Sequence, residues 1–462
     1  MPRLITGAKM FRKKAAPLDI TGGPVRQTLI ALALPVIVLN LLRAGYNIVD
    51  LFWIGRLGKE YLAGVSGSIF LVWALHALSH LVTTGISAGV SRNAGEGRVD
   101  RAAANAGRAL HYTVWLGLIV TLCLYPLIPY LITYVGMSSI ATQAGIKYLE
   151  VMTIFTVIIF LMFALHSVMI ARGDTVTPVR VYGVTFILNI LLSPLLMFGW
   201  GPFPRLGVSG AAYATIVCYL ITAVWFWRVL RRRGWISFDR RIIDGLIPLG
   251  RYFSLGYPLA LTGMMSSFIY FFIANVAARF GDEALGAMGI GHKVESLAYF
   301  FAFGFATGLS SFVGQNLGAQ RDDRAIEATR LAFGWVSVAI IVYTAATMFF
   351  APQIIALFND DPVLVTHGVD YLWIVMPAEV LQMLTIIVEN GVFTGSGYTR
   401  PSFMVSLPIT LARIPLAWFL AVTCGLGAAG IWATIALTMA LNSFIFVALF
   451  RRGQWRTVKI VS

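Results

Sequence analysis

Long apolar runs, separated by short polar segments, occupy almost the whole chain. We distinguish twelve runs, each near the roughly 20 apolar residues that a helix needs to cross the hydrocarbon core of a bilayer. They cover approximately residues 28–54, 61–90, 109–133, 145–170, 179–199, 207–228, 252–278, 285–313, 327–351, 367–393, 402–424 and 427–450. This pattern predicts an all-α integral membrane protein with twelve transmembrane helices, and it leaves no room for a separate catalytic domain.

The chain also repeats itself at an offset of 223 residues. Many matching positions are polar, Gly or Pro, so shared hydrophobicity alone does not produce the repeat: Pro35 pairs with Pro258, Arg56 with Arg279, Asn93 with Asn316, Gly95 with Gly318 and Asp100 with Asp323. Each copy holds six spans, an even number, so both copies enter the membrane in the same direction. We therefore expect two six-helix bundles related by a pseudo-two-fold axis along the membrane normal.

The repeat and the spans together divide the chain into five parts. We expect a cytoplasmic N-terminal segment (1–27), an N-lobe with spans 1 to 6 (28–228), a basic cytoplasmic linker (229–251), a C-lobe with spans 7 to 12 (252–450) and a cytoplasmic tail (451–462). The linker has to carry the chain from one lobe to the other on the cytoplasmic side.

Composition and charge agree with a lipid environment. Of the 462 residues, 58% are hydrophobic and only 12% are charged, too few to cover the surface of a water-soluble domain of this size. The net charge of +15 is unevenly placed, because the odd-numbered loops hold few basic residues: Arg56, Lys59, Lys147, Arg205 and Arg279. This asymmetry follows the positive-inside rule. It predicts a multi-pass protein of the cell inner (plasma) membrane with both termini in the cytoplasm, in contact with lipid and without a nucleic-acid partner.

Little in the sequence indicates metal, ATP or catalysis. Cys123, Cys218 and Cys424 are isolated in apolar runs. His76 and His80 lie one helical turn apart, but no third ligand is evident, so polar packing is favoured over a metal site. The Gly-rich segments lack a Gly-Lys-Ser/Thr motif, so ATP is not expected as the energy source. We predict no cofactor, no metal and no enzyme activity, and we expect a monomer that handles a small-molecule substrate.

Asp50 is a carboxylate inside span 1, and an ionisable side chain there costs roughly 2.5–3.5 kcal/mol on insertion scales. Its counterpart in the second copy is Ile273, so the shared scaffold does not require a carboxylate at this position. Arg43, Asn47 and Asp50 share one face of the helix. Two interpretations stay open: a buried Asp50–Arg43 pair that fixes packing, and a carboxylate that binds a coupling cation.

The second copy has its own polar residues inside the spans. Lys293 and Glu295 lie early in span 8, and Glu389 and Asn390 lie late in span 10; neither carboxylate is repeated in the first copy. Lys293 and Glu295 point to different sides of a helix, so Lys293 is free to pair with another carboxylate such as Glu389. An ion pair joining spans 8 and 10 and a second site for an ion or substrate are the two alternatives. Glu379, just after Pro377, is interpreted as a residue of a helix kink.

Several short segments carry a family resemblance. In the first copy they are residues 18–24 (LDITGGP), 31–35 (ALALP), 46–50 (YNIVD), 54–58 (IGRLG) and 172–178 (RGDTVTP), and in the second copy 313–319 (VGQNLGA) and 395–401 (GSGYTRP). Together they make the chain resemble a multidrug and toxic compound extrusion (MATE) transporter over about residues 18–450. The likeness is greater to the DinF-like branch than to the NorM-like branch.

This resemblance implies a secondary antiporter that exports organic, usually cationic or amphipathic, compounds against an inward flow of H⁺ or Na⁺. It implies a cation site at Asp50, for which we expect help from Asn189, Asn47 and Tyr46. It also implies a bend of span 1 at Pro35 when Asp50 is protonated. Ser193 departs from the family, which usually has an aspartate at that position. The alternative function is a flippase for a lipid-linked oligosaccharide or a related amphiphile.

Overall fold

The computed structural model describes residues 20–95, 98–172, 174, 176–238, 248–396, 398 and 400–456, and within them every regular element is a helix. The first copy of the repeat forms α1 (Val25–Gly55), α2 (Lys59–Leu78), α3 (His80–Gly95), α4 (Val99–Leu124), η1 (Tyr125–Leu127), α5 (Ile128–Val135), α6 (Ser139–Ile154), α7 (Thr156–Ala171), α8 (Val176–Phe198) and α9 (Val208–Arg232). The second copy forms α10 (Leu249–Ala278), α11 (Asp282–Gly318), α12 (Asp322–Phe349), α13 (Ala351–Phe358), α14 (Pro362–Ile386), η2 (Ile387–Phe393), α15 (Thr394–Ser396), α16 (Arg400–Trp418), η3 (Phe419–Thr423), α17 (Ala428–Arg452) and η4 (Gln454–Arg456).

These helices account for the twelve expected spans. Within the described residues, ten helical segments are long and apolar enough to cross a membrane, and the pair α6–α7, bent by 55° at Phe155, makes an eleventh. The twelfth is α10, whose apolar part Gly263–Ala278 is shorter. The fold class is confirmed as an all-α membrane protein with two six-helix lobes.

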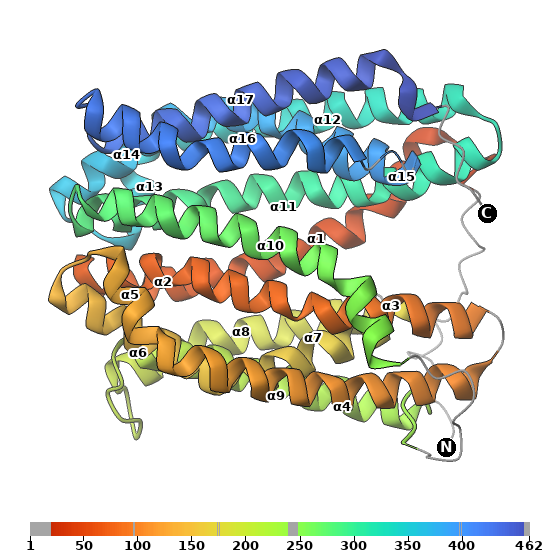
Figure 1. Cartoon of the computed structure of the whole chain (residues 1–462), viewed down its shortest axis with the longest axis horizontal. Helices are drawn as coiled ribbons and strands as arrows, with labels where there is room; N and C mark the ends of the chain where they lie inside the picture. Colours follow the sequence, from red (N-terminus) through yellow and green to blue (C-terminus); the bar gives the residue numbers. More distant parts are fainter. Residues whose placement is uncertain are drawn as a thin grey trace, which may run out of the picture.

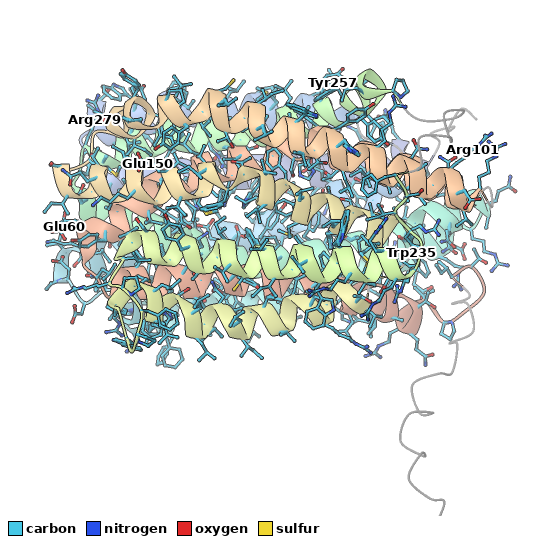
Figure 2. The ribbon with its side chains drawn as sticks, turned by 90° about the horizontal axis from the view of Figure 1, so that it is seen from below. Glu60, Arg101, Glu150, Trp235, Tyr257 and Arg279 are labelled. Atoms are coloured by element: carbon cyan, nitrogen blue, oxygen red, sulfur yellow. The ribbon has the colours of Figure 1, made fainter. Side chains whose placement is uncertain are left out.

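The two lobes lie side by side with their helices roughly parallel (Figure 1). We call the end of the bundle that holds Gly95, Arg232 and Arg452 the basic end, and the other end, which holds Gly55 and Phe358, the closed end. Figure 2 shows Arg101 at the basic end and Glu60 with Arg279 at the closed end. The basic end is the one that the charge pattern predicts to be cytoplasmic.

At the basic end, the first helix of each copy packs against the other lobe. The N-terminal half of α1 buries Val25, Leu29, Ala33 and Ile37 in a core with α11 and α12, and the backbone of α1 lies directly against Gly304 of α11. In the same way α10 crosses toward α3, as Figure 1 shows. This reciprocal exchange reflects the pseudo-two-fold relation of the lobes.

Polar contacts join the lobes at the closed end. The Lys59 ammonium at the start of α2 lies 2.8 Å from Glu283 Oε1 and 2.8 Å from Asp361 Oδ2, both in the C-lobe. Asn275 of α10 donates to the carbonyl oxygen of Tyr134 at 2.6 Å. A side-chain hydrogen bond also links Ser138 with Asp282. These contacts hold the two lobes together at this end.

Aspartate side chains cap the starts of two helices, one at the closed end and one at the basic end. The Asp361 carboxylate accepts hydrogen bonds from the backbone N–H groups of Val363 and Leu364, and Pro362 fills the first position of α14. Before α8, Asp174 accepts from the Thr177 N–H at 2.9 Å and from Arg233 at 2.5 Å. Burial opposes the ionised form, but these hydrogen bonds outweigh it and lower the pKa of Asp174.

Candidate cation site and adjoining cavity

Asp50 lies near the closed-end half of α1, is only 6% exposed and receives three hydrogen bonds. Ser193 Oγ and Asn189 Nδ2, both on α8, donate to Asp50 Oδ1 at 3.0 and 3.3 Å. Thr215 Oγ1 on α9 donates to Asp50 Oδ2 at 2.5 Å. The four side chains are buried and come from three helices, so packing of the N-lobe alone creates this site.

The donors around Asp50 are neutral, and their oxygens also suit a cation. Asn189 Oδ1 is buried, and within the described residues no hydrogen bond reaches it. The Ser193 and Thr215 hydroxyl groups donate to Asp50 now, but each has lone pairs that it can present after a rotation. A carboxylate with three such oxygens is a ligand set for a hard cation, and the carboxylate alone can take a proton.

The family resemblance suggested that Ser193 weakens the site, because the family usually has an aspartate at this position. In the structure Ser193 instead belongs to the site. It leaves Asp50 as the carboxylate, with a hydroxyl group in place of a second negative charge. The prediction that Asn189 assists Asp50 agrees with the geometry. Thr215 was missed, because nothing in a lone Thr within an apolar span distinguishes it before the helices are packed.

Tyr46 lies one turn from Asp50 on α1 but forms its hydrogen bond elsewhere. Its hydroxyl group donates to Thr185 Oγ1 on α8, and Thr222 of α9 donates to the same oxygen at 3.3 Å. Tyr46 is therefore a neighbour of the site and no direct partner of Asp50. Asn47 and Arg43 also lie on α1, but their side chains fall outside the described residues, so the predicted roles of both stay predictions.

A cavity of about 680 Å³ lies next to the Asp50 site. It has the size of a small-molecule site. Its wall comes from α1, α2, α3, α7, α8 and α9 of the N-lobe and from α11 of the C-lobe: Tyr46, Trp73, His76, Ser79, His80, Thr83, Thr84, Met162, Phe163, His166, Ser167, Tyr182, Tyr219 and Phe300. The two histidines that resembled a metal pair both line this space, and no group of three His, Cys, Asp or Glu side chains in the described residues is placed to hold a metal.

The cavity and the Asp50 site share helices at a spacing of one turn. Tyr46 precedes Asp50 by four residues on α1, and Tyr219 follows Thr215 by four residues on α9. Four residues of α-helix span roughly 6 Å. The Asp50 site and the cavity wall therefore share two helices, α1 and α9, at neighbouring turns.

The C-lobe contains a second buried polar cluster, around Glu295 of α11. Tyr371 of α14 donates a hydrogen bond to Glu295 Oε1, and His292 Nδ1 lies 3.5 Å from Glu295 Oε2. Glu379, also on α14, is 2% exposed and interacts electrostatically with Glu295 and Arg413. The kink interpretation of Glu379 overlooked this cluster, which an acidic side chain within a span does signal.

Of the two alternatives for Lys293 and Glu389, the structure contradicts the ion pair that would join spans 8 and 10. Glu389 lies in the π-helical turn η2, and Gly391 of the same turn packs against Leu309 of α11. Leu309 follows Lys293 by 16 residues, which places the two roughly 24 Å apart along α11. Lys293 instead lies with its ammonium 5.5 Å from the centre of the Trp73 ring and interacts electrostatically with Asp50. Asn390 follows Glu389 in η2 and is half-buried there, so neither joins Glu295 in one site.

Comparison with known proteins agrees with this architecture. The MatE family matches residues 35–195 and again 258–419, two segments that begin at the 223-residue offset of the repeat. The chain is 25% identical to a probable multidrug resistance protein NorM of Thermotoga maritima, with 93% of each chain covered. It is 26% identical to an FAD transporter of Shewanella oneidensis, over 86% of this chain and 87% of the relative.

Solved structures show the same fold. An inward-facing conformation of a multidrug resistance MATE family transporter of the MOP superfamily superposes with a TM-score of 0.81 at 23% identity, covering 92% of this chain and 98% of the other. An outward-facing conformation of such a transporter gives a TM-score of 0.74, covering 96% and 100%. With the family matched over both repeats, the chain is a member of the MatE family of multi-pass membrane transporters.

Proposed function

We propose that the protein is a secondary antiporter of the plasma membrane that exports small organic compounds in exchange for H⁺ or Na⁺. The observation that carries this proposal is the buried Asp50 carboxylate, which has neutral oxygen neighbours and lies one helical turn from a cavity. The coupling cation is transported cargo and is expected to enter from the closed end when that end opens. Both termini are expected in the cytoplasm.

Coupling requires that the cation bind the two conformations with different affinity, since otherwise it drives nothing. The contacts of Asp50 supply this difference, because its partners lie on α8 and α9 while α1 reaches into the other lobe at the basic end. A cation at Asp50 would replace the Ser193 and Thr215 hydrogen bonds with ion–oxygen contacts. It would thereby reposition α1 beside the cavity and lower the affinity for substrate.

Glu295, with Tyr371, His292 and Glu379, is a candidate for a second ion site in the C-lobe. We place it below Asp50 because Arg413 supplies a fixed positive charge to this cluster. The flippase alternative is not favoured, since the relatives reported above are named as a multidrug resistance protein and an FAD transporter. Because a relative reported above is named NorM, the DinF-like assignment stays a proposal, and it rests on the segments 18–24, 31–35, 46–50 and 54–58.

The test is Asp50→Asn in proteoliposomes, with efflux of a fluorescent substrate measured under separately imposed pH and Na⁺ gradients. We expect the variant to bind substrate but to lose acceleration by either gradient, because a neutral amide neither accepts the proton nor balances the charge of Na⁺. Asp100→Asn, an exposed carboxylate at the start of α4, is the control and should behave as the wild type. Gradient-driven efflux that persists in Asp50→Asn would show that the coupling site lies elsewhere.

A further inference from the structure

The cavity carries groups that attract negative charge. His76 of α2, His80 of α3 and His166 of α7 all contribute to its wall. An imidazole can donate a hydrogen bond to a phosphate or carboxylate oxygen, and its protonated form adds a positive charge. Three helices thus bring three imidazoles to one space of about 680 Å³.

The described part of the cavity wall is free of acidic side chains. Among the described residues that line the cavity, none is Asp or Glu. The nearby Asp50 carboxylate is turned into its own site by Asn189, Ser193 and Thr215. The Lys293 amino group lies 5.5 Å from the ring centre of Trp73, a residue of the cavity wall, and adds positive charge on this side when it is protonated.

The rest of the wall is aromatic. Trp73, Phe163, Tyr182 and Phe300 line the space together with Tyr46 and Tyr219, whose ring centres are 6.4 Å apart. Aromatic side chains bind flat ring systems through stacked and edge-to-face contacts. Such a wall selects for shape, while the imidazoles and Lys293 select for charge.

We propose that the cavity binds planar aromatic compounds that carry an acidic group, so that aromatic anions are substrates of the exporter. This inference rests on the proposed function for transport, but the binding preference stands independently of it. The rings stack within the aromatic wall, and the phosphate or carboxylate accepts hydrogen bonds from the imidazoles. It differs from the organic cations that the family resemblance implies.

An aromatic wall can also hold an organic cation over its ring faces. Within the described lining, such a cation would meet three imidazoles and no carboxylate. The sign of the charge on the preferred ligand therefore separates the two possibilities.

The experiment measures binding to the purified full-length protein in neutral-lipid nanodiscs by fluorescence, without any ion gradient. Riboflavin and riboflavin 5′-phosphate share one ring system and differ by a phosphate, and ethidium is a planar aromatic cation. We expect the phosphate to bind at least about tenfold more tightly than riboflavin, which is the gain from one charge-assisted hydrogen bond. Ethidium should bind most weakly. Equal affinity for the two flavins, or tighter binding of ethidium, would overturn the proposal.

Variants assign the preference to the cavity. His166→Gln should weaken binding of the phosphate about tenfold and that of riboflavin less than about twofold, whereas Trp73→Leu should weaken both alike. His111→Gln is the matched control, since His111 is exposed and packs against Phe238 outside the cavity. Loss of the phosphate preference in His111→Gln, or its retention in His166→Gln, would contradict the assignment.

The same materials separate this inference from the proposed function. Selective binding of the phosphate without gradient-driven efflux would refute the antiport mechanism and leave the ligand class standing. Gradient-driven efflux of ethidium without flavin-phosphate preference would refute the ligand class and leave antiport standing.

Discussion

At Gly55 the backbone of the N-lobe packs directly against the backbone of the C-lobe at the closed end, and an added methyl group there should open that end. A Cβ atom at Gly55 would lie 2.1 Å from the carbonyl oxygen of Phe358 and 2.8 Å from its carbonyl carbon. Neighbouring Asn359 donates to the Gly55 carbonyl oxygen at 2.9 Å, so the two segments are held in register. Because the obstacle is backbone, no side chain can turn aside to admit the methyl group.

The size of the effect follows from this overlap. Ordinary van der Waals contact begins near 3.4 Å, so Gly55→Ala requires a separation of roughly 1 Å between the ends of α1 and α13. Overpacking of this kind typically costs about 1–3 kcal/mol. The cost falls only on conformations with the closed end shut, so the ratio of open to shut molecules should rise about 5- to 150-fold.

Pulsed electron paramagnetic resonance can measure this shift. Spin labels at Tyr61 and Val363, exposed residues of the two lobes near the Lys59–Asp361 contact, report the separation of the lobes. The background has the three native cysteines replaced by Ala. Gly55→Ala should transfer population to longer distances, whereas Gly183→Ala, with nothing within 4 Å of the added Cβ, should not. An unchanged distance distribution in Gly55→Ala would refute the reasoning.

Three further predictions concern charge, capping and the bend of α1. Lys59 holds the pKa of Asp361 below its ordinary value of 3.8, so their contact stabilises the shut closed end fully above that pH and is lost only below it. The spin-label distance should therefore stay constant from pH 5 to 8 in the wild type. It should lengthen at pH 7 in Asp361→Asn. Asp174→Ala removes the hydrogen bonds at the start of α8 and should lower the free energy of unfolding by about 1 kcal/mol, read as a lower melting temperature, with Asp100→Ala nearly unchanged. Pro35→Ala restores a backbone hydrogen bond within α1 and should slow gradient-driven efflux at unchanged substrate affinity; an unaltered transport rate would remove Pro35 from the conformational cycle.

Much of the fold is readable along the sequence because bilayer crossing is a local property. A helix in lipid satisfies its own backbone hydrogen bonds, so a sufficiently long apolar run predicts a span without knowledge of its neighbours. Comparison of the two copies of the repeat also marked Asp50 as exceptional, since Ile273 fills the equivalent position in the second copy. The α6–α7 bend and the break between α2 and α3 are details that hydropathy did not reveal.

The candidate site could be predicted only in part. Asp50 can be recognised from the sequence as a charged residue within an apolar span, and Asn189 is suggested by the family resemblance. Thr215 lies 165 residues from Asp50, and Thr is common in apolar helices, so nothing along the chain joins the two. The Lys293–Glu389 pair was suggested by opposite charges on two spans, but a charge pattern does not tell at which depth two helices meet.

The sequence by itself determined the twelve spans, the doubled architecture and the position of the unrepeated carboxylates, all of which depend on residue type and spacing. Only the tertiary structure decided which side chains surround Asp50, that Ser193 donates to it, and that three histidines face a cavity without a carboxylate in its described lining. Those relations depend on how helices rotate and cross, which is set by close packing of many weak contacts. The proposed preference for aromatic anions therefore rests on the packing of the lobes and could not be proposed from the sequence.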